Sequence, residues 1–194
     1  MSNPTSAAVI SHKVENFETW KAAFDAHAQA RTDAGIAAAH VNQAVEDPNQ
    51  VTVYLASDDD QAIAAFIGSP DLKDAMQQAG VVGAPSIAFV TPVENETVTD
   101  RPLAGVIIRH EVEDYTAWKK GFDAHGEARG AAGVVGHAIN CAADNPNLVI
   151  LYLQAEKVEQ LQGLAGSDEL KAAMKDAGVK GAPDISFVQG GDWS

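Results

Sequence analysis

The chain has 194 residues, of which 46% are hydrophobic and 21% are charged, and it contains a single cysteine. This composition excludes collagen, disulfide scaffolds and disordered chains, and the length allows one or two domains. The 13 Lys and Arg residues against 27 Asp and Glu residues give a formal net charge of −14, so we expect no nucleic-acid partner.

The start of the chain and its hydropathy predict neither export nor membrane insertion. Residues 1–8 lack the cationic and apolar stretches of a secretory signal. The sequence nowhere reaches the roughly 18 uninterrupted apolar residues of a membrane span. The lone Cys141 cannot form an internal disulfide, as is typical of a reducing compartment. We therefore expect a cytoplasmic protein without membrane contact.

The sequence repeats itself at a spacing of about 98 residues. Residues 10–90 align with residues 108–188 without a gap, and about 36 of the 81 aligned positions are identical. A match of this extent at a fixed spacing is the signature of a tandem repeat. We predict a first repeat over residues 7–90, a polar linker with prolines over residues 91–104, and a second repeat over residues 105–189.

Hydrophobic periodicity within the first repeat predicts strands and helices in a fixed order. Residues 8–14 alternate as a strand, and residues 16–35 have helical spacing between an N-cap, Asn16, and a stop at Gly35. Residues 40–45 and 51–56 form a predicted hairpin. Residues 59–67 and 69–80 are predicted helices, and residues 86–90 the last strand. This β-α-β-β-α-β order is ferredoxin-like, an α+β fold.

The two repeats are expected to associate through their sheets. Helices cover only one face of each predicted sheet, yet strand residues 106–108 and 149–153 are apolar on both sides. We therefore predict an intrachain pseudo-dimer, an eight-stranded α+β barrel with its helices outside. A barrel of about eight strands is either filled by side chains or holds a small ligand. Further homo-oligomerisation is left open.

A motif at the start of each repeat resembles a known group of proteins. Residues 14–35 and 112–133 share the pattern Val-x-[Asn/Asp]-[Phe/Tyr]-x-x-Trp-Lys-x-x-Phe-Asp-x-His-x-x-x-Arg-x-x-x-Gly. The pattern is similar to the opening of the dimeric α+β barrel proteins related to the antibiotic biosynthesis monooxygenases. The resemblance implies a small-molecule pocket and, in some relatives, cofactor-free oxygenation of aromatic polyketides or quinols. The tryptophan and asparagine pair of those enzymes has no clear match in this chain.

Histidine and tyrosine residues at matching positions of the repeats are the candidate acid–base groups. A histidine titrates near pH 6.5 and can act as a general base toward an acidic phenol or enol. The alternative is a histidine at the edge of the core, bonded to a carbonyl or carboxylate. Whether the histidine or the tyrosine faces the predicted enclosure is left open. The candidates are His12, His110, Tyr54 and Tyr152.

A second group of matched residues recurs along one stripe of the first predicted helix of each repeat. A histidine and an arginine four residues apart share the stripe with a tryptophan. They either orient an anionic or carbonyl-bearing ligand, or belong to the helix–sheet core with the arginine reaching a surface carboxylate. The candidates are Trp20, His27 and Arg31, with Trp118, His125 and Arg129.

Motifs for metals and common cofactors are missing from the sequence. It contains neither His-Glu-x-x-His nor Cys-x-x-Cys, and it lacks a P-loop, a dinucleotide fingerprint and Gly-x-Ser-x-Gly. We therefore expect no metal and no cofactor, and a buried, inert Cys141.

Two functions from different classes follow from these patterns. The leading one is a small-molecule-binding α+β barrel protein, a candidate cofactor-free monooxygenase-like enzyme acting on an aromatic or enolic substrate. The alternative is a non-catalytic structural or interaction module whose barrel is filled by side chains.

Overall fold

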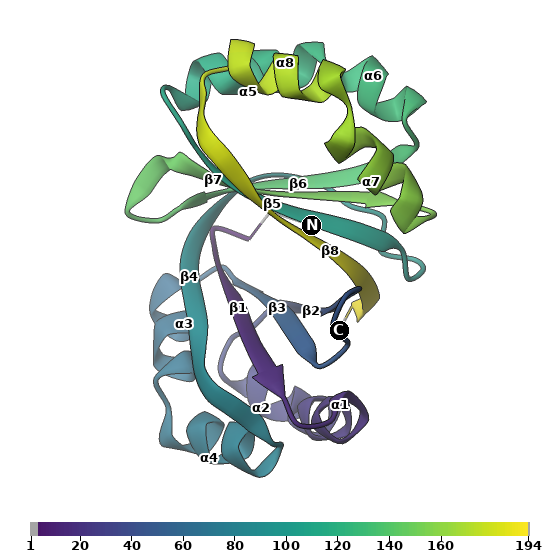
Figure 1. The fold of residues 1–194 in the computed structure, drawn as a ribbon. Helices are drawn as coiled ribbons and strands as arrows, with labels where there is room; N and C mark the ends of the chain where they lie inside the picture. The colour runs from purple at the N-terminus through teal and green to yellow at the C-terminus, as the bar shows by residue number, and fades with distance from the viewer. Residues whose placement is uncertain (1–3, 194) are drawn as a thin grey trace. The chain divides into compact units, whose positions relative to one another are not determined.

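The computed structural model describes residues 4–193 and shows the same order of elements twice (Figure 1). Each half contains four strands and four short helices. The first half comprises β1 (Ser6–Val14), α1 (Phe17–Ala26), α2 (Ala28–Asp33), β2 (Ala38–Ala44), β3 (Gln50–Ser57), α3 (Asp60–Ile67), α4 (Pro70–Gln78) and β4 (Val81–Glu96). The second comprises β5 (Ala104–Val112), α5 (Tyr115–Ala124), α6 (Gly126–Ala131), β6 (Val134–Ala142), β7 (Asn145–Ala155), α7 (Val158–Gly166), α8 (Asp168–Asp176) and β8 (Val179–Trp193). The predicted fold class, α+β with two ferredoxin-like repeats, is confirmed.

The chain divides into two compact units that nearly follow the repeats. Unit 1 holds the chain through Thr91 together with the segment that begins at Gly191, and unit 2 holds Pro92–Gly190. Strand β4 continues to Glu96. The segment 91–104, which the sequence suggests as a linker, therefore begins with strand residues, and its part from Pro92 onward belongs to the second unit.

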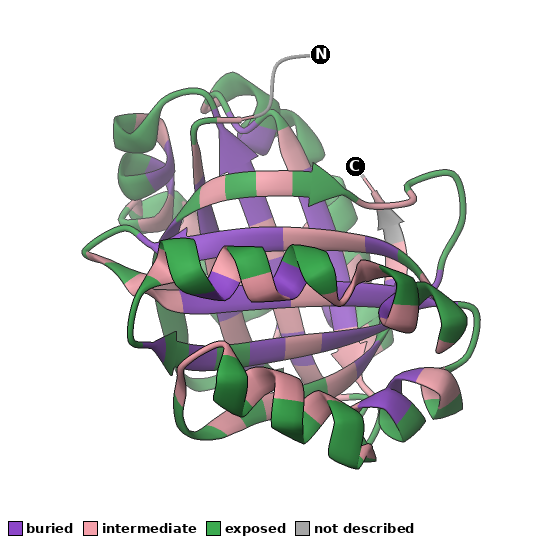
Figure 2. Ribbon diagram, turned by 90° about the horizontal axis from the view of Figure 1, so that it is seen from above, coloured by how far each residue is buried: buried purple, intermediate pink, exposed green. Residues whose placement is uncertain are grey.

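The sheets of the two units have the same antiparallel order. In unit 1, β1 pairs with β3 and β4, and β2 pairs with β3. In unit 2, β5 pairs with β7 and β8, and β6 pairs with β7. The registers also match, because Ile10 lies opposite Val53 and Ile108 lies opposite Leu151. The helices of each unit lie over one face of its sheet, and Figure 2 shows exposed residues on the outer sides of those helices.

One hydrophobic core fills each unit between the helices and the sheet. In unit 1 the core joins strand residues such as Val51 and Val53 to Trp20 of α1 and Ile63 of α3. Their counterparts in unit 2 form the second core. Alternating residues of each strand therefore point to the helices, as the strand period requires.

The helix ends follow the predicted capping residues, with one difference. The Asn16 side chain accepts a hydrogen bond from the Thr19 N–H, and Ser69 caps α4 with Pro70 in its first turn. Gly35 has φ 81°, a left-handed conformation that glycine adopts without strain. The predicted helix over residues 16–35 is instead two helices, because His27, with ψ 8°, lies outside the helical region. Among the described residues, none of the helices has the length and hydropathy to cross a bilayer.

Gln154 of β7 fixes the segment that follows β4 within unit 2. Its buried amide donates a hydrogen bond to the Val98 carbonyl at 3.1 Å and accepts one from the Val98 N–H at 2.8 Å. A Cβ atom on Gly136 would lie 2.6 Å from Gln154 Oε1. The amide therefore occupies a space that only a glycine at position 136 leaves open.

We expect Gln154→Ala to destabilise the protein by about 1–3 kcal/mol, because it leaves both backbone groups of Val98 without their partner. The midpoint of urea unfolding measures the effect. Gln162→Ala, in an exposed position of α7, is the matched control and should change the free energy of unfolding by less than about 0.5 kcal/mol. Equal losses in the two variants would contradict a role for the Val98 hydrogen bonds.

Candidate functional site

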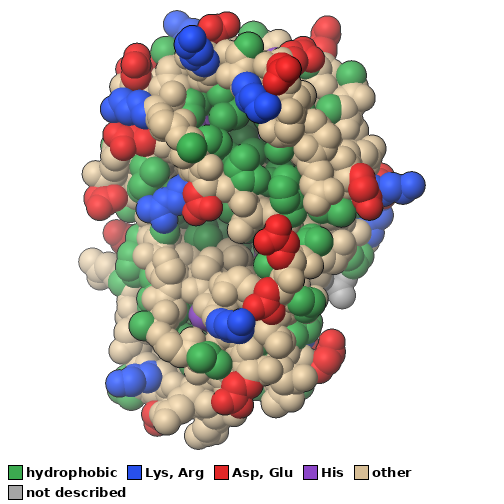
Figure 3. All heavy atoms as spheres, in the orientation of Figure 1, with side chains coloured by type: hydrophobic (Ala, Val, Ile, Leu, Met, Phe, Trp, Pro, Cys, Tyr) green, Lys and Arg blue, Asp and Glu red, His purple; other side chains and the backbone are tan. Residues whose placement is uncertain are grey.

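Each unit contains a small cavity between its helices and its sheet. The cavity of unit 1 measures about 70 Å³ and that of unit 2 about 50 Å³. Figure 3 shows hydrophobic side chains gathered in a hollow of the surface where unit 2 lies in this view. The cavity of unit 1 is lined by Ile10, His12, Trp20, Ala23, Phe24, His27, Arg31, Val53, Leu55, Phe66, Leu72, Ala75, Met76 and Ala79. That of unit 2 is lined by Ile108, His110, Trp118, Gly121, Phe122, His125, Arg129, Leu151, Leu153, Leu170, Ala173, Met174 and Ala177.

Most of the candidate site residues from the sequence line these two cavities. In unit 1 they come from β1, from α1, from the break after α1 and from α2. The equivalent residues of β5, α5 and α6 line the cavity of unit 2. The structure brings together His12, Trp20, His27 and Arg31 in the first cavity, and His110, Trp118, His125 and Arg129 in the second.

The two tyrosines lie on the other side of the sheet. Val53 and Leu55 line the first cavity, so Tyr54 between them points to the opposite face. Burial raises the pKa of Tyr54 and of Tyr152 to about 12. The alternation therefore places the histidines on the helix side, and it separates the two kinds of residue that the sequence suggested as acid–base partners.

His12 is a buried imidazole whose ring nitrogens have no hydrogen-bond partner among the residues that the structure describes. The residue is 5% exposed, and its ring centroid lies 5.3 Å from that of Trp20, with 59° between the planes. Burial lowers the pKa of His12 to about 4. The ring is therefore neutral at pH 7 and offers the cavity one N–H donor and one nitrogen acceptor.

His110 repeats this arrangement in unit 2. Its nitrogens are likewise without a partner in the described part of the chain, and its ring centroid lies 5.5 Å from that of Trp118. Burial again lowers the pKa to about 4. The two repeats have thus kept the same unpaired polar group in the same apolar surroundings.

A row of aromatic rings with an arginine at its end forms one wall of the first cavity. Trp20 and Phe24 are stacked with centroids 5.2 Å apart, and the Arg31 guanidinium carbon lies 3.8 Å from the Phe24 centroid. Arg31 Nη1 donates a hydrogen bond to the Phe24 carbonyl at 2.5 Å. The side chain therefore turns back over the end of α1, where the carbonyl groups of the helix favour a cation.

The same wall recurs in unit 2. Trp118 and Phe122 are stacked at 5.3 Å, and the Arg129 guanidinium carbon lies 3.4 Å from the Phe122 centroid. Arg129 Nη1 donates to the Phe122 carbonyl. Each arginine thus reaches a helix carbonyl, whereas the structural alternative from the sequence required a surface carboxylate.

The histidines between the paired helices differ in their surroundings. His27 Nδ1 is buried and without a hydrogen bond to any described residue. His125 Nε2 lies 3.8 Å from a carboxylate oxygen of Glu169, a residue of α8 whose side chain is mostly exposed. Among the described residues, a carboxylate therefore lies within 4.0 Å of this histidine in the second cavity only.

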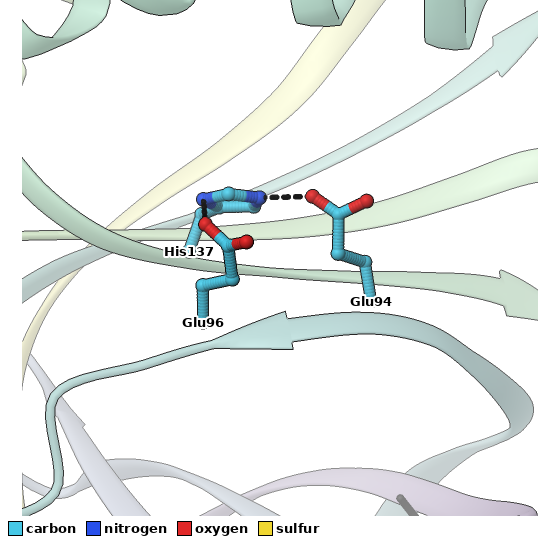
Figure 4. Close-up of side chains that lie close together, drawn as sticks. All are labelled: Glu94, Glu96 and His137. Atoms are coloured by element: carbon cyan, nitrogen blue, oxygen red, sulfur yellow. Dashed lines mark hydrogen bonds and ion pairs between the residues drawn. The ribbon is translucent and has the colours of Figure 1, made fainter.

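A polar cluster next to the second cavity was missed by sequence reasoning. His137 Nε2 lies 2.5 Å from Glu94 Oε1, and His137 Nδ1 lies 3.8 Å from Glu96 Oε2 (Figure 4). Glu94 Oε2 also pairs with Lys119 Nζ at 2.9 Å. Both glutamates fell in the predicted linker, and an alternation continuing beyond residue 90 was the only signal that a strand carries them to β6.

This cluster is better described as an ion-pair network than as a metal site. Its three side chains are close enough to share an ion, but the carboxylates face different nitrogens of one ring, whereas an ion binds one nitrogen. Burial raises the pKa of Glu94, but hydrogen bonds from Lys119 and His137 outweigh it and hold the pKa below its ordinary value. The His137 ring centroid lies 5.3 Å from that of Phe122, so the network supports the wall of the second cavity.

Cys141 is a buried thiol in the core of unit 2, as the sequence predicted. Burial raises its pKa to about 11. A thiol with this pKa is protonated at pH 7 and is a poor nucleophile.

Comparison with known proteins identifies the fold. No family model matches the sequence, and no curated protein does. Among solved structures, an anthrone oxidase-like protein has TM-score 0.69 at 13% identity, covering 100% of this chain and 94% of that chain. A Listeria monocytogenes ferredoxin-fold protein related to antibiotic biosynthesis monooxygenases has TM-score 0.58 at 8% identity, covering 98% and 96%. A monooxygenase-like protein from Listeria innocua has TM-score 0.53 at 10% identity, covering 94% and 93%.

These similarities concern the fold alone, because the identities are low. They extend over nearly the whole of each chain, so both repeats take part in the match. The protein therefore shares the two-repeat, ferredoxin-like α+β fold of these monooxygenase-like structures.

We expect the two buried histidines to make the free energy of unfolding depend on pH. The unfolded chain binds protons near pH 6.5, whereas the folded imidazoles bind them only near pH 4. The unfolded state therefore holds more protons between these values, and stability falls as the pH is lowered through this window. Each histidine contributes up to about 1.4 kcal/mol per pH unit.

Urea unfolding measures this dependence at several pH values between about 4.5 and 7, the range that lies between the folded and unfolded pKa values of the histidines. The double variant His12→Leu/His110→Leu should lose stability less steeply than the unmodified protein as the pH falls. Tyr54→Phe/Tyr152→Phe is the control and should keep the original slope, since tyrosine does not titrate there. Identical slopes in all three proteins would refute the assignment.

Proposed function

We propose that each repeat binds one small molecule in the cavity between its helices and its sheet, and that the chain is a cofactor-free, monooxygenase-like enzyme for an aromatic or enolic substrate. The observation that supports this function best is the unpartnered, buried imidazole of His12, repeated at His110. A buried polar group without a partner costs about 1–3 kcal/mol. Retention of the same unfavourable group in both repeats is explained if a ligand completes its hydrogen bonds.

The role that fits this imidazole is a neutral hydrogen-bond partner of an acidic hydroxyl or enol. With a pKa of about 4 in the ligand-free cavity, His12 is a weak base toward a phenol in water. In an apolar cavity the proton can still move within the hydrogen bond, because the resulting cation and anion stabilise each other. We therefore assign His12 and His110 as the proton acceptors, and Trp20 and Trp118 as the rings that position a planar ligand.

The two tyrosines are not part of this proposal. Their face of the sheet is the one opposite the cavities, and their raised pKa keeps them protonated. We expect them to pack within their own units. The ring of Tyr152 lies against Gly105, where a Cβ atom added to the glycine would be 2.4 Å from the ring.

The alternative function is a non-catalytic structural or interaction module. The size of the cavities favours it, because about 70 and 50 Å³ is less than half the roughly 150 Å³ of an engineered cavity that binds benzene. A ring-sized ligand would therefore have to displace side chains of the cavity wall. The duplication would then serve stability, by joining two copies that otherwise associate at a concentration-dependent cost.

Thermal unfolding in the presence of quinols and polyketide-like phenols distinguishes these functions. A ligand that binds the folded state stabilises it by RT ln(1 + [L]/Kd), about 2.7 kcal/mol when its concentration is 100 times Kd. We expect stabilisation, with two ligands bound per chain by titration calorimetry. The double variant His12→Ala/His110→Ala should lose most of it.

Tyr54→Phe/Tyr152→Phe is the matched control, because these side chains lie outside both cavities, and it should bind as the unmodified protein does. If no compound raises the unfolding temperature, the module function stands instead. If the histidine variant binds as well as the unmodified protein, the ligand lies outside the two cavities.

A further inference from the structure

Arg31 and Arg129 are buried cations, and no described residue is their anionic partner. They are 5% and 8% exposed, and within the described chain neither has a carboxylate oxygen within the 4.0 Å of an ion pair. Burial lowers the pKa of both guanidinium groups. A buried charge is normally paired, since leaving it unpaired is costly.

The nearest acidic side chains are already bonded to lysines. Asp25 raises the pKa of Arg31 from a distance, but its carboxylate oxygens lie 2.6 and 2.7 Å from Lys21 Nζ. In unit 2, Asp123 Oδ1 likewise lies 2.5 Å from Lys119 Nζ. Among the described residues, both buried arginines are therefore left without a direct counter-ion.

The hydrogen bond from each arginine to a helix carbonyl uses only part of its capacity. A guanidinium group has five N–H donors in a planar fork, and Arg31 spends one on the Phe24 carbonyl. The stacking of the group over Phe24 fixes its plane, which is the arrangement that suits two-point binding of a planar anion.

The other residues that line the cavity indicate what the rest of an anionic ligand would look like. Beyond Arg31 the lining consists of aliphatic and aromatic side chains, and its unpartnered polar groups are imidazoles. A ligand that fits has an anionic group at one end and a compact apolar or aromatic body. The volume of about 70 Å³ favours a body of few atoms.

We propose that Arg31 and Arg129 are specificity-determining residues, and that the ligand of each cavity is a compact carboxylate whose anionic group the guanidinium binds. This inference rests on the proposed binding function of the same cavities and specifies its ligand class. In the second cavity the field of Glu94 also acts on Arg129, and it would oppose an anion there.

The experiment is an NMR titration of the full chain with two matched pairs of compounds, isobutyrate with isobutyramide and benzoate with benzamide. Each pair has the same shape and differs in charge. We expect carboxylate binding in the unmodified protein to be tighter than amide binding by about 10- to 100-fold, as for hydrogen bonds to a charged group. The ring signals of His12 and His110 should shift on binding.

Variants test the residue assignment. Arg31→Gln should remove one of the two carboxylate sites, and Arg31→Gln/Arg129→Gln should remove the preference for carboxylate while changing amide affinity by less than about threefold. Arg31→Lys should retain part of the preference, because lysine keeps the charge without the planar fork. Arg101→Gln is the matched control, since Arg101 is exposed and paired with Glu156, and it should leave both affinities unchanged.

The outcomes separate this inference from the function on which it rests. Equal affinity for the acid and its amide in the unmodified protein would overturn the carboxylate inference and leave small-molecule binding intact. A preference that persists in the double glutamine variant would also overturn it. Histidine signals that do not shift with any of the four compounds would count against both proposals.

Discussion

The structure depends on the need to cover the apolar helix-facing side of each sheet. In the first repeat that side contains Ile10, Val51 and Val53. If this apolar surface stayed in contact with water, the protein would lose the hydrophobic free energy that drives folding. Helix α1 covers it mainly with one large residue, Trp20, which is 4% exposed. The indole is also part of the wall of the cavity that remains between the helices and the sheet.

The geometry of the strand and the helices explains why the polar groups of the first cavity come from β1 and α2. His12 follows Ile10 by two residues, so the strand period turns it to the helix side whether or not the site has a function. Arg31 reaches the cavity because the helix breaks at His27 and the short helix α2 returns toward Phe24. Strand and helix geometry therefore bring the two residues to one cavity, although His12 lies on β1 and Arg31 on α2, with the whole of α1 between them in the sequence.

The repeat made the fold predictable, whereas the details of the site depended on side-chain geometry that periodicity does not encode. The capping residue Asn16, the stop at Gly35 and the period of β1 located the elements, and matched positions identified His12, Trp20, His27 and Arg31. Periodicity alone left open which side of the sheet faces the helices, so Tyr54 was grouped with His12. Glu94 was missed because a polar, proline-containing segment resembles a linker even where it continues a strand.

The charge distribution sets the two cavities apart from the rest of the molecule. The chain carries a formal charge of −14, and this field repels anions from most of its surface. Among the described residues that line each cavity, the one fixed charge is a guanidinium, and the neighbouring imidazole is kept neutral by burial. Coulomb interactions in such a poorly solvated space are several times stronger than at the surface. A local cation can therefore dominate recognition in the cavity even though the protein as a whole is strongly acidic, and salt would weaken the long-range repulsion more than the short-range attraction.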